Sequence, residues 1–182
     1  MARKLVLTGF MATGKSAVGA IVARRLNWPL IDSDAEIESR AGKSIVTIFA
    51  EDGEPRFRAL EREIIAELAA RHEPAVIATG GGALIDDTNF AALSRTGVII
   101  CLAAHPEVIA ARVAGSGRTR PKLLEGDLPL EDRITELLAA RSAAYARAAA
   151  TIDTSELTRD QAAEQVLAAF AQHGGNRCGA SA

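Results

Sequence analysis

A glycine-rich segment near the start of the chain has the residue types and spacing of a phosphate-binding loop. Residues 9–16 read Gly-Phe-Met-Ala-Thr-Gly-Lys-Ser and fit the pattern G-x-x-x-x-G-K-[ST]. The apolar run Leu5–Leu7 before it predicts a buried strand, and helical apolar spacing after it predicts a helix over Ser16–Leu26. Backbone N–H groups and a helix N-terminus bind phosphate in this setting, while Lys15 contacts the β- and γ-phosphates and Ser16 ligates Mg²⁺. The residues expected to bind nucleotide here are Gly9, Ala12, Thr13, Gly14, Lys15, Ser16 and Ala17.

Two carboxylates follow the next predicted strand. Asp32 and Asp34 flank Ser33 directly after the apolar pair Leu30-Ile31. The carboxyl ends of parallel strands form the edge at which such sheets bind ligands. We therefore expect one of Asp32 and Asp34 to serve Mg²⁺ through water and the other to face a substrate hydroxyl. The alternative is that Asp32 or Ser33 only caps a helix predicted over Ala35–Ala41.

Two later segments carry further candidates. Arg58 and Glu61 are three residues apart on a helix predicted from Pro55, so the carboxylate can hold the guanidinium. From spacing alone, however, a solvated helix face with ordinary ion pairs is the favoured interpretation. The three glycines at 80–82 directly follow the predicted strand Ala75–Thr79, where they let a ligand approach the backbone and expose N–H donors. A flexible turn is the alternative.

A basic segment in the second half of the chain has the composition of a lid. Arg112 lies near the end of a predicted helix, and glycines then flank Arg118, Arg120 and Lys122. We predict a lid over about 115–127 that closes cations over phosphates and excludes water. An ordinary basic surface loop is the alternative.

The elements that would position these residues alternate between strands and helices. This alternation predicts an α/β fold with a mainly parallel sheet, in three α/β/α layers. The five strand candidates are Lys4–Thr8, Pro29–Asp32, Ala75–Thr79, Gly97–Leu102 and Thr151–Asp153. The remaining predicted helices cover Ser44–Ala50, Asp86 or Asp87 to Leu93, His105 to near Gly115, Leu130–Ala149, and Thr158 or Asp160 to Gln172. We expect one domain over 1–173, with a substrate-binding helical segment at about 33–62, and a disordered tail over 174–182.

Composition excludes several classes of protein. The 182 residues are 48% hydrophobic, enough for one domain with a proper core. A net charge of −2 argues against a nucleic-acid partner, and no apolar run is long enough to span a bilayer. The first residues lead directly into a strand, leaving no room for a signal peptide, and Cys101 and Cys178 have no metal-type spacing. We therefore expect a cytoplasmic protein without a membrane partner.

The less informative side chains are predicted to have structural roles. His72, His105 and His173 share no ligand spacing and are expected at the surface, while Trp28 and Tyr145 are expected to pack.

In combination, these motifs resemble the shikimate kinase family over nearly the whole chain. The phosphate-binding loop is common to many kinases. Four further motifs, in this order, are more specific to the family. They are Asp-Ser-Asp at 32–34, Phe57-Arg58, the glycines at 80–82, and Arg141 with Tyr145 four residues later. The resemblance implies a five-stranded parallel sheet of the nucleoside-monophosphate-kinase type. It also implies Mg²⁺-dependent transfer of the γ-phosphoryl group of ATP to the 3-hydroxyl of shikimate. We separately expect a monomer.

The resemblance further implies roles for single residues. Asp34 would contact the ring hydroxyls and position or deprotonate the acceptor, while Arg58 and Arg141 would hold the carboxylate. Arg112 would stack on adenine, and Arg120 would contact the phosphates. The substrate-binding glycines would be Gly80, Gly81 and Gly82, and the catalytic residues Lys15, Asp34 and Arg120.

The lid departs from the family pattern. The family usually has Arg-Pro-Leu-Leu there, and this chain has Lys122 between Pro121 and the leucine pair, with Arg118 close by. Arg118 or Lys122 can therefore share the role of Arg120.

Two other functions are compatible with the phosphate-binding loop. One is a kinase of another small polyhydroxy acid such as gluconate, against which Arg58, Arg141 and the three glycines argue. The other is a nucleotide-binding domain without catalysis, against which the intact Lys15 and Asp34 argue.

Overall fold

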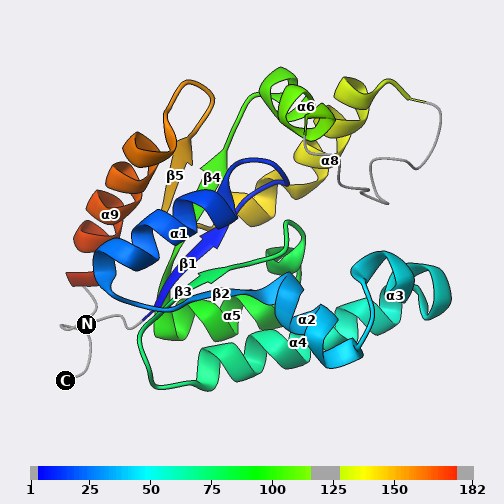
Figure 1. The fold of residues 1–182 in the computed structure, drawn as a ribbon, viewed down its shortest axis with the longest axis horizontal. Coiled ribbons are helices and arrows are strands. Elements are labelled where there is room, and N and C mark those ends of the chain that lie inside the picture. The colour runs from blue at the N-terminus through cyan, green and yellow to red at the C-terminus, as the bar shows by residue number, and fades with distance from the viewer. Residues whose placement is uncertain (1–3, 116–127, 176–182) are drawn as a thin grey trace.

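Five parallel strands form the centre of the protein in the computed structural model, which describes residues 4–115 and 128–175. The strand order is β2-β3-β1-β4-β5 (Figure 1). The strands are β1 (Lys4–Thr8), β2 (Leu30–Asp32), β3 (Ala75–Ala78), β4 (Gly97–Ala103) and β5 (Ala150–Asp153). The predicted fold class, a five-stranded parallel α/β/α sheet, is confirmed.

Helices cover both faces of the sheet. They are α1 (Lys15–Leu26), α2 (Ser33–Ala41), α3 (Ile45–Glu51), α4 (Gly53–Ala70), α5 (Asp87–Thr96), α6 (Pro106–Ala114), α8 (Leu130–Tyr145) and α9 (Arg159–Gly175), with a short 3-10 helix η1 (Ala83–Ile85). Helices α1 and α9 lie on one face, and α4 and α5 lie on the other (Figure 1). Side chains of successive strand residues point to opposite faces, so Leu5 and Leu7 pack in one apolar cluster and Val6 in the other.

The predicted helix over Leu130–Ala149 is too long. Helix α8 ends at Tyr145, and the next residues form tight turns in which Arg147 N–H donates to Ala144 O and Ala148 N–H to Tyr145 O. Ala149 N–H then donates to Ile99 O, which starts the pairing of β5 with β4. The alanine run favours a helix locally, but pairing with the sheet determines where it ends.

The start of helix α4 and the end of helix α9 also differ from the prediction. Helix α4 begins at Gly53, before Pro55. Helix α9 continues to Gly175, so the first two residues of the predicted tail are helical. The rest of that tail, 176–182, lies outside the described residues.

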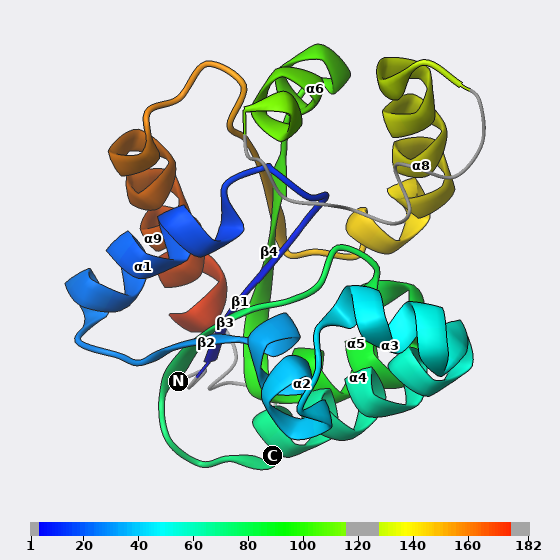
Figure 2. The ribbon, with the colours of Figure 1, turned by 45° about the vertical axis from the view of Figure 1, so that its right-hand side comes forward.

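The functional segments gather at one edge of the sheet. The phosphate-binding loop follows β1, the Asp-Ser-Asp segment overlaps the end of β2, and the glycines follow β3. Helices α6 and α8 lie beyond the carboxyl ends of β1 and β4 in both ribbon views (Figures 1 and 2). This edge is therefore the place to look for chemistry.

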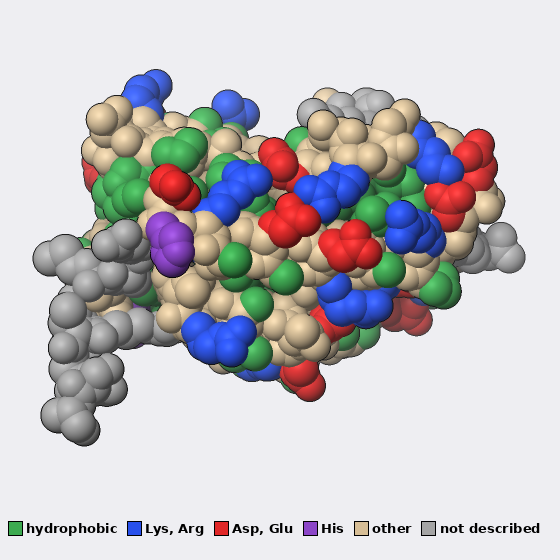
Figure 3. Space-filling model, turned by 90° about the horizontal axis from the view of Figure 1, so that it is seen from below, with side chains coloured by type: hydrophobic (Ala, Val, Ile, Leu, Met, Phe, Trp, Pro, Cys, Tyr) green, Lys and Arg blue, Asp and Glu red, His purple; other side chains and the backbone are tan. Residues whose placement is uncertain are grey.

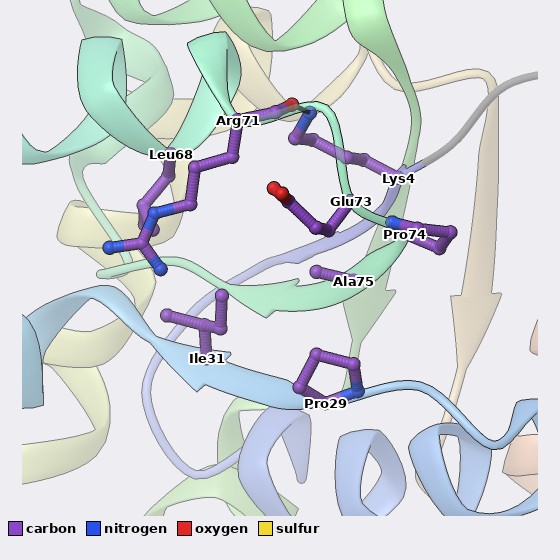
Figure 4. A pocket seen from close by; sticks show the side chains of 8 residues that line it. All are labelled: Lys4, Pro29, Ile31, Leu68, Arg71, Glu73, Pro74 and Ala75. Carbon is purple, nitrogen blue, oxygen red and sulfur yellow. Dashed lines mark hydrogen bonds between the residues drawn. The ribbon is translucent and has the colours of Figure 1, made fainter.

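A hollow of about 350 Å³ lies at the opposite edge, where β2 and β3 begin (Figure 4). Its lining is Lys4, Pro29, Ile31, Leu68, Arg71, Glu73, Pro74 and Ala75. It contains none of the predicted site residues.

Candidate functional site

The phosphate-binding loop has the backbone conformation that its glycines allow. Gly9 has φ 129°, and a Cβ there would lie 2.1 Å from Leu102 O, so any larger residue would clash with β4. Lys15 Nζ donates to Gly9 O and to Phe10 O, both at 2.8 Å. The ammonium is thus held on the loop itself, and the first N–H groups of α1 point out of the helix toward the same region.

Ser16 and Asp32 form a pair of oxygen donors beside this loop. Ser16 Oγ donates to Asp32 Oδ2 at 3.1 Å, and Asp32 Oδ1 accepts from Asp34 N–H at 3.0 Å. Asp32 therefore does cap α2, as the alternative held, while its second oxygen faces Ser16. A hydroxyl and one carboxylate, completed by water and phosphate oxygens, fit what Mg²⁺ prefers in kinases.

Asp34 is a carboxylate in an unfavourable environment for its charge. Its Oδ1 is buried and accepts no hydrogen bond within the described part of the chain. Burial, and next the charge of Asp32, raise the pKa of Asp34 to about 6, against the effect of Lys15. A polar atom left without a partner at a sheet edge is ready to accept a hydrogen bond from a ligand.

Three consecutive glycines each lie against a different functional group. A Cβ at Gly80 would lie 2.6 Å from Asp34 Oδ1, and one at Gly82 would lie 3.2 Å from Arg58 Nη2. At Gly81 it would lie 3.2 Å from Gly9 O and 3.3 Å from Nη1 of Arg141. The turn at 80–82 is therefore tightly surrounded rather than a loose connection, and it lies between the phosphate-binding loop and both arginines.

The prediction of a solvated face for Arg58 and Glu61 is wrong. The Glu61 side chain is only 2% exposed, and its Oε2 accepts from Arg58 Nη1 at 2.7 Å. Arg58 also donates to Glu54 Oε1 at 3.1 Å. Burial raises the pKa of Glu61, while Arg58 lowers it. The pair is an inward-facing element of the site, because α4 turns this face toward the glycines.

Arg141 brings a second guanidinium from α8. The residue is 8% exposed, and its guanidinium lies over the Phe10 ring at 5.2 Å from the ring centroid. No carboxylate among residues 4–115 and 128–175 forms an ion pair with it. A buried cation without an ion pair favours an anionic ligand.

The comparisons with known proteins agree with this arrangement. The family model for shikimate kinase matches residues 11–171. A shikimate kinase from Pelotomaculum thermopropionicum is 43% identical over 171 residues, covering 94% of this chain and 97% of the relative. The chain belongs to the shikimate kinase family.

Solved structures show the same relationship. A shikimate kinase from Acinetobacter baumannii, in complex with shikimate, superposes with a TM-score of 0.87 at 31% identity, with 95% of each chain covered. A gluconokinase from Sinorhizobium meliloti superposes with a TM-score of 0.66 at 18% identity, covering 100% of this chain and 98% of that one. The second likeness concerns the fold alone.

In this member of the shikimate kinase family, Arg112 connects α6 to the nucleotide loop. Its Nη1 donates to Ala12 O at 3.3 Å and to Thr154 Oγ1 at 3.1 Å, and Nη2 donates to Thr154 O at 2.7 Å. The Thr154 hydroxyl also lies 3.0 Å from Thr13 O. These bonds use N–H groups at the edges of the guanidinium. Thr154 was not predicted, because no motif marks it in the sequence.

The predicted lid residues and the two aromatic residues predicted to pack remain to be placed. Arg118, Arg120 and Lys122 lie outside the described residues. Tyr145 was predicted to pack; its ring does pack with Phe10 and its neighbours, but its hydroxyl also donates to Gly81 O at 2.6 Å. The predicted packing role of Trp28 fits its edge-on contact with Phe170.

Proposed function

We propose that the protein transfers the γ-phosphoryl group of ATP to the 3-hydroxyl of shikimate, giving shikimate 3-phosphate and ADP. The observation that carries this proposal is the glycine turn at 80–82. It brings two arginines and one buried carboxylate together beside a nucleotide loop. A small hydroxylated carboxylic acid needs cations at one end and an acceptor of hydroxyl hydrogen bonds at the other.

The arginines hold the acid end of the acceptor. Arg141, buried and without an ion pair among the described residues, supplies a full positive charge, and Arg58 retains N–H donors beyond those used by Glu54 and Glu61. A planar guanidinium binds a carboxylate through two parallel hydrogen bonds, which fixes orientation as well as position. The ring hydroxyls are thereby directed toward Asp34.

Asp34 accepts the hydroxyl hydrogen bond and then the proton. Its free Oδ1 is the acceptor, and with a pKa of about 6 it is mostly ionised at neutral pH while remaining a better base than an ordinary aspartate. The residues at the glycine turn exclude water from this side of the acceptor.

The nucleotide side neutralises the phosphates. Lys15 exchanges its bonds to Gly9 O and Phe10 O for phosphate oxygens when ATP binds. Ser16 and Asp32 would hold Mg²⁺, which would supply charge stabilisation on the β- and γ-phosphates when bound. Arg112 would stack on adenine. Arg120 lies outside the described residues, and its contact with the phosphates stays a prediction from the family resemblance.

The surface charge and the helix composition bear on the partners and the location of the protein. Basic and acidic side chains are interspersed on the face seen from below (Figure 3). Ion pairs between surface side chains, such as Arg40–Glu67 and Arg62–Asp86, balance the charge locally. Such a surface does not favour nucleic acid. None of the described helices is long and apolar enough to cross a membrane. We propose a cytoplasmic monomer that binds only small substrates.

The test is ADP release by the purified protein with ATP and Mg²⁺, measured with shikimate, with gluconate and with neither. Release that requires shikimate is the expected result. Release with gluconate alone would overturn the assignment of Arg58 and Arg141 to a shikimate carboxylate. A second preparation assayed with EDTA should lose all release, because the phosphates would then lack the charge stabilisation of a Mg²⁺ ion held by Ser16 and Asp32.

A further inference from the structure

Tyr145 connects the two halves of the acceptor site. Its ring packs in the apolar cluster that contains Phe10 and Ile134, and its hydroxyl donates to Gly81 O at 2.6 Å across 64 positions of sequence. Arg141 lies one helical turn earlier on α8, with Nη1 3.3 Å from the position of a Cβ on Gly81. Tyr145 and Arg141, one helical turn apart on α8, therefore both lie against the glycine turn at Gly81.

The carbonyl of Gly81 differs from those on either side of it. Gly80 O accepts from Ala83 N–H at 3.2 Å, and Gly82 O accepts from Ile85 N–H at 3.1 Å, so both are held by the chain just ahead. Gly81 O receives its hydrogen bond, within the described part of the chain, from the Tyr145 hydroxyl. Without that donor, no hydrogen bond within the described residues would fix the orientation of the Gly81 carbonyl, and glycine backbone tolerates more orientations than other residues.

We propose that Tyr145 is a positioning residue for the acceptor substrate: its hydroxyl fixes the Gly81 peptide and thereby the distance between Arg141 and the glycine turn. This inference rests on the proposed phosphorylation of shikimate, and it adds a residue that the nucleotide side does not use. Rotation of the Gly81 peptide would move Gly80 and Gly82, which lie against Asp34 and Arg58. All three groups that hold the acceptor would lose their alignment together.

The hydroxyl remains protonated under ordinary conditions. Burial raises the pKa of Tyr145 to about 12, against the effect of Arg141. Cys101 is the other titratable group facing it, and burial raises the pKa of that thiol to about 11. The donor is therefore available throughout the neutral range.

The first experiment removes the hydroxyl and keeps the ring. Tyr145→Phe is expected to raise the KM for shikimate roughly 3- to 10-fold, the cost of one hydrogen bond, with the KM for ATP changed less than about twofold. Ser142→Ala is the matched control, because Ser142 lies on the same helix and its hydroxyl contacts only Ala139 O among the described residues. It should leave both KM values unchanged. A KM for shikimate in Tyr145→Phe equal to that of the unaltered protein would overturn the inference.

A second experiment separates hydrogen bonding from packing and does not depend on the folding of Tyr145→Phe. The sequence contains one tyrosine, so replacing tyrosine by 3,5-difluorotyrosine alters position 145 alone. Fluorine makes the phenol more acidic, and an ionised phenol cannot donate to Gly81 O. We expect the KM for shikimate to rise with pH in the fluorinated protein while that of the unaltered protein stays flat. Superimposable pH profiles would contradict the inference.

The two proposals fail in different ways. If the unaltered protein releases no ADP with shikimate, the proposed function itself is wrong. If it does so and the Tyr145 variants match it in KM for shikimate, only the positioning role is wrong. A lowered melting temperature in Tyr145→Phe with both KM values unchanged would show a purely structural role and would equally overturn the inference.

Discussion

Replacing Asp34 by Asn should make the protein more stable and nearly inactive. The pKa of Asp34 lies at about 6, above the 3.8 of an ordinary aspartate, because of burial and then the charge of Asp32. The ionised carboxylate therefore costs the folded state stability, and the difference corresponds to roughly 3 kcal/mol at 1.36 kcal/mol per pKa unit. Part of that cost remains for a buried amide, so we expect a gain of about 1–2 kcal/mol for Asp34→Asn at neutral pH.

The pH dependence of this gain is the sharper prediction. A carboxyl whose folded pKa is raised costs stability fully above pH 6 and costs none below pH 3.8, where it is protonated in both states. The gain of Asp34→Asn should therefore be largest at neutral pH, roughly 2–8 °C in melting temperature, and should vanish as the pH falls through the interval between the two values. Thermal unfolding from acidic to neutral pH measures it.

A control with the opposite sign is present in the chain. Hydrogen bonds from Ser155 lower the pKa of Asp153, an exposed residue, so Asp153→Asn should lose stability at neutral pH rather than gain it. In the same preparations, kcat of Asp34→Asn should fall about 10²- to 10⁴-fold, as expected on loss of a general base. A melting temperature for Asp34→Asn that is unchanged, or raised equally at all pH values, would refute the electrostatic reasoning.

The other predictions concern single contacts. Lys15→Met should abolish most ADP release with little change in melting temperature, because it removes one charged group that donates to the loop carbonyls Gly9 O and Phe10 O at the site where phosphates would bind. A large loss of stability would contradict this. Arg58→Ala should raise the KM for shikimate about 10-fold or more and leave ATP binding unchanged. The substitution removes the ion-pair partner of the buried Glu61 and a hydrogen-bond donor to the substrate carboxylate. Weakened ATP binding with normal shikimate affinity would reverse the assignment of Arg58. Thr154→Val should raise the KM for ATP roughly 3-fold, because it removes one of the three hydrogen bonds that hold Arg112. Thr154→Ser should restore the KM, which steady-state kinetics with varied ATP would measure.

Local sequence signals were enough for much of the site. The phosphate-binding loop, the capping role of Asp32 and the N-cap of α3 at Ser44 depend on residues within a few positions of one another. The same holds for β1, whose predicted and observed bounds agree, since it is a short buried apolar run. Such local structures can be predicted from the sequence because they depend on the backbone geometry of a few neighbouring residues.

Contacts between distant segments were not predictable in this way. The spacing of Arg58 and Glu61 is equally compatible with a solvated face, and only the packing of α4 against the sheet buries the carboxylate. Thr154 meets Thr13 across 141 positions, and Tyr145 meets Gly81 across 64. Nothing in the spacing of these residues encodes such contacts, because they arise where several strands end at one edge.

If the proposed site is correct, the glycine turn is what lets phosphoryl donor and acceptor meet. Gly81 lies against the backbone of the phosphate-binding loop on one side and Arg141 on the other, while its neighbours lie against Asp34 and Arg58. A side chain on any of the three would separate groups that phosphoryl transfer needs within reach of one another. Since such transfer asks the protein chiefly for position and charge, the absence of side chains at this turn is itself a functional feature of the sequence.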